Sequence, residues 1–117
     1  MIYVVLVKNS EGVLIECSVK GHAGFAKNGK DIVCAAVTTL VKTSVASLNN
    51  STCDGSLVKC TAFGDGEFAF VTNQTAFSKE RLIYAGEFLQ NGFELLQKEF
   101  SQYLELRINI TNKPAEA

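Results

Sequence analysis

The stretch GHAGFAKNGKDIVCAAVT, from Gly21 to Thr38, is the point at which the pattern of the chain changes from strand to helix. Before it, apolar and polar residues alternate over Val13–Val19, which is typical of a strand. After it, apolar residues recur at steps of three and four, which predicts a helix over Asp31–Leu48. A glycine-bearing loop, Ala23–Lys30, joins the two. This segment therefore predicts a fold that mixes strands and helices.

Strand and helix patterns also alternate over the rest of the chain. The expected strands are Ile2–Val7, Val13–Gly21, Leu57–Phe63, Glu67–Thr72 and Leu104–Ile110, and the expected helices are Asp31–Leu48 and Ser78–Tyr103. Each helix has a single apolar stripe, so each has one face to bury. The sequence predicts one two-layer α+β domain over residues 1–117, in ββαββαβ order, with two helices on one face of a mixed five-stranded sheet.

The composition narrows the classes of function. The chain has 117 residues, 47% of them hydrophobic and 20% charged, and a formal net charge of -1. A protein that binds nucleic acid directly is normally basic, so this class is not expected. No apolar run approaches the 18 residues of a membrane span, and no signal peptide is recognisable after Met1. We therefore expect no membrane partner.

The chain has four cysteines: Cys17, Cys34, Cys53 and Cys60. Nothing indicates secretion, so reduced thiols are expected. Cys17 and Cys60 stand at inward-facing positions of strands and are interpreted as small core residues. The sequence has no CxxC pair and a single histidine, so neither a zinc site nor another cofactor is expected.

His22 and Cys34 are the candidate catalytic pair. Cys34 lies three residues after Asp31, whose side chain is a good N-cap, and so would be the third residue of the helix. Free amides and the positive end of the helix dipole favour a thiolate there. His22 ends the preceding strand pattern, and the loop is long enough to return it to Cys34. An imidazole beside a thiol makes a nucleophile at neutral pH.

A structural interpretation of the same residues stays open at this level. Cysteines within apolar helices are often inert core residues, and a lone histidine after a strand is often a surface residue. Three functions remain in view from the residues: a thiol protease, a thiol acyl-transfer or redox enzyme, and a non-enzymatic binding factor. Spacing alone does not separate them.

The segment resembles the signature of the ribosomal-processing cysteine proteases, the Prp family. That signature is Gly-His-Ala, a loop with glycine, and then Gly-x-Asp-Ile-Val-Cys-Ala-Ala. The matching residues here are Gly21-His22-Ala23, Gly24, and Gly29 to Ala36. Family members usually carry serine where this chain has Thr38, and threonine keeps the hydroxyl group.

The resemblance implies a cytoplasmic cysteine endopeptidase, usually a homodimer. The alternative within the same resemblance is a non-enzymatic ribosome-assembly factor that keeps the motif as a binding loop. Its implied substrate is the N-terminal segment of ribosomal protein L twenty-seven, from which it removes an extension by cutting after an aromatic pair. Cys34 would be the nucleophile and His22 the general base and acid. Asp31 and Thr38 would cap the helix or touch substrate. A lid loop would include Ala23, Gly24, Asn28 and Gly29.

Overall fold

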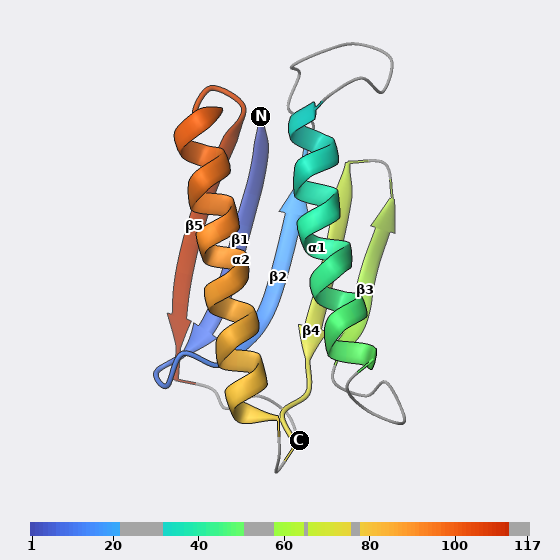
Figure 1. Ribbon diagram of the computed structural model, residues 1–117, viewed down its shortest axis with the longest axis vertical. Coiled ribbons are helices and arrows are strands. Elements are labelled where there is room, and N and C mark those ends of the chain that lie inside the picture. Colours follow the sequence, from blue (N-terminus) through green and yellow to red (C-terminus); the bar gives the residue numbers. More distant parts are fainter. Residues whose placement is uncertain (22–31, 51–57, 65, 76–77, 113–117) are drawn as a thin grey trace.

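The structure is a computed structural model that describes residues 1–21, 32–50, 58–64, 66–75 and 78–112. A sheet carries two helices on one of its faces (Figure 1). The elements are β1 Ile2–Asn9, β2 Leu14–Lys20, α1 Ile32–Asn50, β3 Val58–Gly64, β4 Glu67–Thr72, α2 Lys79–Glu99 and β5 Leu104–Thr111. The predicted α+β class, two-layer arrangement and ββαββαβ order are confirmed.

The sheet is mixed, as predicted, with strand order β3-β4-β2-β1-β5. The pairs β1–β2, β2–β4 and β3–β4 are antiparallel, and β1–β5 is parallel. The last strand therefore pairs with the first, and β1 lies inside the sheet. The valine-rich pattern of β1 predicts a strand that is either central or buried on both faces. It is an interior strand, between β2 and the edge strand β5, and it is not buried on both faces, because Tyr3, on the face away from the helices, is 51% exposed.

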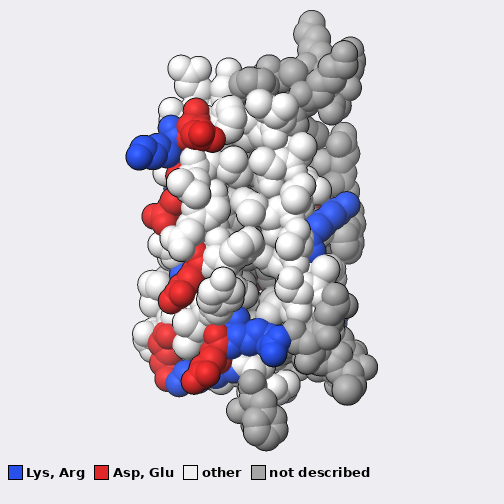
Figure 2. All heavy atoms as spheres, viewed as in Figure 1, with Lys and Arg blue, Asp and Glu red and all other residues white. Residues whose placement is uncertain are grey.

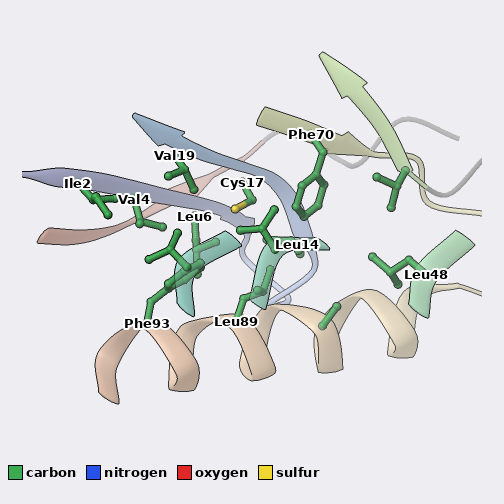
Figure 3. Close-up of a cluster of buried hydrophobic side chains, with 14 of the residues drawn as sticks. Ile2, Val4, Leu6, Leu14, Cys17, Val19, Leu48, Phe70, Leu89 and Phe93 are labelled. Carbon is green, nitrogen blue, oxygen red and sulfur yellow. The ribbon is translucent and has the colours of Figure 1, made fainter. Parts of the chain in front are cut away.

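The hydrophobic core lies between the sheet and the two helices. Ile2, Val4 and Leu6 of β1 point toward the helices and are at most 1% exposed. Figure 3 shows them facing Leu89 and Phe93 of α2. Alternate residues of a strand face opposite sides of the sheet, so one parity of each strand supplies this core. Burial of these side chains is the main stabilising term of the domain.

The turn between β1 and β2 follows from its residues. The Asn9 side-chain oxygen accepts hydrogen bonds from the backbone N–H groups of Glu11 and Val13, at 2.9 and 3.0 Å. Gly12 has φ +86°, a conformation that residues with a Cβ rarely adopt. Asparagine and glycine thus close the hairpin that the sequence predicts.

The predicted extent of the second helix is wrong at its C-terminal end. The helix ends at Glu99, and Phe100 is its C-cap, with its N–H donating to the carbonyl of Leu96 at 2.8 Å. Tyr103 instead accepts a backbone hydrogen bond from Ile2. Pairing between the start of β1 and the chain entering β5 thus ends the helix earlier than the apolar pattern indicates.

Ser78 occupies the N-cap position of α2, but its side chain makes no capping hydrogen bond. The hydroxyl instead accepts a hydrogen bond from the N–H of Thr75, at 2.6 Å. Serine here stabilises the turn before the helix, a local alternative that hydroxyl side chains often adopt.

One helix among the described residues, Ile32–Asn49 within α1, is long and apolar enough to cross a membrane by length and composition, with mean hydropathy 1.4. The expectation that no apolar segment is long enough to span a membrane is therefore wrong for this helix. A single such helix is weak evidence, because core helices and signal sequences pass the same test. Val33, Val37 and Val41 of this helix are buried against the sheet, which accounts for part of its apolar character.

Candidate active site at the start of α1

Cys34 lies in the first turn of α1, which begins at Ile32. It is the third helical residue, the position predicted from the sequence. The first backbone N–H groups of a helix have no partner within the helix, so they can stabilise a negative charge nearby. The Cys34 side chain is half-buried and packs against the core. An anion formed at this thiol would lie close to the backbone amides of the first turn of α1 and to the positive end of the helix dipole.

The two flanks of α1 have different neighbours. Leu40 belongs to the flank that meets α2, because its side-chain carbons come within 2.9 Å of the place where a Cβ on Gly92 would lie. Cys34 and Thr38 are one turn apart on the other flank, together with half-buried Val45. The thiol therefore faces away from α2, over the side of the sheet where β4 and β3 lie (Figure 1). Thr38 is exposed on the same flank.

The chain that leads from β2 toward the candidate histidine is fixed at Gly21. Its N–H donates to the carbonyl of Gly66 at 2.7 Å, and its φ is +96°. A Cβ at this position would come much closer than 3.0 Å to the Met1 carbonyl oxygen. Glycine is thus required both by backbone conformation and by space. Figure 1 shows β2 ending at the same end of the sheet as the first turn of α1.

Gly21 is a residue whose role the sequence reasoning missed. The available signal was a glycine that ends an alternating strand pattern directly before the sole histidine. The structure describes Cys34 and Thr38 and places them on one flank. The remaining sequence-predicted site residues, His22, Ala23, Gly24, Asn28, Gly29 and Asp31, lie outside the described residues. The pairing of histidine and cysteine and the lid therefore stay predictions.

The other described thiols are less suited to catalysis. Cys17 is completely buried, and this desolvation, helped by the negative charge of Glu16, raises the pKa of its thiol to about 12. Cys60 is half-buried on β3 and packs against the core. Cys17, Cys34 and Cys60 are all free of disulfide bonds. Cys53 lies outside the described residues. Cys34 is thus the described thiol that combines partial exposure with a helix N-terminus.

Two hollows lie along the seam between α1 and α2, on the flank opposite Cys34. One, of about 500 Å³, is lined by Ala35, Leu40 and Leu95 among others. The second, of about 330 Å³, lies toward the other end of α1, beside Ser44 and Arg81. Neither contains the thiol. A ligand bound in either hollow would therefore lie on the flank of α1 opposite the Cys34 thiol.

The chain is similar to one protein family and to several solved structures. A family model described as "Cysteine protease Prp" matches residues 1–105. No match was found among curated protein sequences.

Solved structures similar to this chain include the ribosomal processing protease Prp from S. aureus with a covalently linked product peptide. Its TM-score is 0.78 at 22% identity, covering 93% of this chain and 100% of that chain. The protein SMU.848 from Streptococcus mutans has a TM-score of 0.74 at 26% identity, covering 95% and 96% of the two chains. A hypothetical protein from Staphylococcus aureus has a TM-score of 0.64 at 13% identity, covering 95% and 100%.

Proposed function

The chain belongs to the Prp family of cysteine proteases, and we propose that it is a ribosomal-processing endopeptidase that works through Cys34 and His22. The observation that carries this proposal is the position of Cys34, a half-buried thiol in the first turn of α1. Gly21, the residue directly before His22, is fixed at the same end of the sheet. These features support a nucleophile with an imidazole partner.

In the proposed mechanism, the Cys34 thiolate attacks the carbonyl carbon of the scissile peptide bond. The carbonyl oxygen takes up the negative charge, and backbone amides around Cys34 stabilise it. His22, having accepted the thiol proton, gives it to the leaving amine as the C–N bond breaks. Water, deprotonated by His22, then attacks the thioester and releases the carboxylic acid product. The thiol and the imidazole return to their starting states.

The proposed substrate is the N-terminal segment of ribosomal protein L twenty-seven, cut after a pair of aromatic residues. The family signature at Gly21–Ala36 supports this assignment, as does the ribosomal processing role named for the similar S. aureus protein. Asp31 is proposed to cap the helix or to touch substrate, and Thr38, on the same flank of α1 as Cys34, is proposed to lie where substrate passes. The loop Ala23–Lys30 is proposed to close over the peptide. A cytoplasmic location and a homodimer complete the proposal.

The test is cleavage of a synthetic peptide that carries an aromatic pair before alanine, with both fragments identified by mass spectrometry. We expect two fragments from the unchanged protein and none from Cys34→Ala. Cys60→Ala is the matched control, because it removes a second half-buried thiol, on β3, and leaves every residue of α1 unchanged. It should cleave at the rate of the unchanged protein. Cleavage by Cys34→Ala at that rate would overturn the proposal. Binding of the peptide without cleavage by the unchanged protein would favour an assembly factor.

A further inference from the structure

Phe68 is an aromatic residue at the end of the sheet that carries the candidate nucleophile. It is paired with Val19 in the register between β4 and β2. It stands two residues after Gly66, whose carbonyl accepts the hydrogen bond from Gly21. Figure 1 places the start of β4 and the first turn of α1 at the same end of the sheet. The Phe68 side chain is therefore at the level of the turn that contains Cys34.

The Phe68 ring faces the helix layer but is only partly buried. Residues two apart in a strand face the same side, and Figure 3 shows Phe70 pointing from β4 toward the helices. Phe70 is 0% exposed and Val19 is 9% exposed, whereas Phe68 packs against this core and keeps part of its surface accessible. The two rings pair edge to face, with centroids 6.4 Å apart and planes at 73°. Contact with Phe70 thus orients a ring that stays partly open.

Cys34 lies on the flank of α1 over this part of the sheet. Leu40 belongs to the flank that meets α2, and the thiol is on the other flank, over β4 and β3. Side chains of a helix lean toward its N-terminus, so the thiol leans toward the end of the sheet where Phe68 lies. Both residues are partly buried against the same core. The thiol and the open part of the ring therefore border the same region of the surface.

The described residues that face this region from α1 and β4 carry no charge. Besides the thiol they are Thr38 and Val45 of α1, and Phe68, Phe70 and Thr72 of β4. Lys20 and Glu67, at the next register position, point to the other face of the sheet and pair with each other at 3.8 Å. Figure 2 shows no charged side chain over the first turns of α1. A charged substrate side chain would find no counter-charge among these residues, so the region suits an apolar one.

We propose that Phe68 is a specificity-determining residue, whose ring receives the side chain of the substrate residue directly before the scissile bond. This inference rests on the proposed function, because it takes Cys34 as the nucleophile. In the thioester, the Cys34 sulfur is bonded to the carbonyl carbon of that residue. Its Cβ is one bond closer to the sulfur than the Cβ of the residue that leaves with the amine. The region beside the thiol therefore holds the side chain before the bond, and an aromatic one gains an edge-to-face contact with Phe68.

The test compares kcat/KM for acetyl-Ala-Phe-Phe-Ala-amide and acetyl-Ala-Phe-Leu-Ala-amide, which differ in the residue before the last alanine. Phe68→Leu should lower kcat/KM for the first peptide about fivefold, because an aromatic pair contributes beyond its buried area, and should leave the second unchanged. Phe88→Leu is the matched control, because it makes the same substitution at an exposed phenylalanine on α2 and should change neither value. A ratio of the two values that Phe68→Leu leaves unchanged, even if both values fall, would overturn the proposal and give Phe68 a structural role.

Binding to the Cys34→Ala protein separates failure of this inference from failure of the proposed function. Nuclear magnetic resonance spectra of its phenylalanine rings, recorded with acetyl-Ala-Phe-Phe-Ala-amide, should show a shifted Phe68 signal and an unchanged Phe88 signal. Binding at Phe68 without cleavage by the unchanged protein would refute the protease function and keep Phe68 as a peptide-binding residue. Cleavage by the unchanged protein without a shift of the Phe68 signal in Cys34→Ala would refute the role of Phe68 and keep the protease function.

Discussion

Replacing Gly21 by alanine tests how tightly the chain is held before the proposed base. Two effects should make the alanine variant less stable. The backbone φ at position 21 is +96°, a conformation that residues with a side chain rarely adopt. The added Cβ would also clash with the carbonyl oxygen of Met1. The oxygen belongs to the backbone, so relief requires movement of β1 or β2 rather than rotation of a side chain. The structure provides a control in Gly12, whose φ is +86° but whose nearest atom to a new Cβ is 4.0 Å away.

The difference in the free energy of unfolding between Gly12→Ala and Gly21→Ala measures the cost of the backbone clash. A residue held in a sparsely populated conformation costs about 1–3 kcal/mol, and this applies to both positions. Overpacking adds about 1–3 kcal/mol, and this applies at Gly21. We therefore expect Gly12→Ala to lower the free energy of unfolding by about 1–2 kcal/mol and Gly21→Ala by about 4 kcal/mol. With a urea m-value of about 1–3 kcal/mol/M, the midpoints should differ by about 1 M or more.

Activity gives the second readout. A displacement of about 1 Å at a catalytic group can lower a rate by about 100-fold. Gly21→Ala should therefore lower kcat/KM for the peptide by about 100-fold, measured at a temperature where circular dichroism shows the folded state. Gly12→Ala, in the turn at the other end of the sheet, should keep kcat/KM unchanged. Equal urea midpoints for the two variants, with equal kcat/KM, would refute the reasoning about Gly21.

Alkylation of the folded protein at pH 7 should label Cys34 and spare Cys17, because burial raises the pKa of the Cys17 thiol to about 12 and keeps it protonated. Peptide mapping identifies the labelled cysteines. Modification of Cys17 in the folded protein would contradict the burial argument. His22→Ala should retain at most a trace of cleavage, with its optimum at higher pH, where Cys34 ionises without help; a pH-rate profile unchanged from that of the parent protein would remove His22 from the mechanism. Gln90→Leu should lower the free energy of unfolding by about 1.5–3 kcal/mol, because Lys8, a residue with 8% exposure, loses the acceptor that its ammonium group contacts at 2.5 Å. Adding Lys8→Met should recover most of this loss in urea denaturation, and additive effects would show that the two side chains are not coupled.

The sequence by itself determined which elements form and in what order. Alternation over Val13–Val19 and three-to-four spacing after Asp31 are local patterns, because a strand and a helix each expose their faces with a fixed period. The apolar stripe on each helix further indicated that both helices pack on one face of the sheet. The position of Cys34 as the third helical residue followed from the same local reasoning. The end of α2 did not, because Ile2 pairs with Tyr103 from the opposite end of the chain.

The tertiary structure decided which way the helix faces and what surrounds the site. Leu40 packs against Gly92 of α2, and this contact turns Cys34 toward the other flank. Gly21 is held between Met1 and Gly66, which are far from it in sequence, so local spacing carries no information about that constraint. Ser44 and Arg81 meet at one hollow because α1 and α2 lie side by side. Local periodicity fixes the faces of an element, whereas contacts between distant residues fix how those faces are combined.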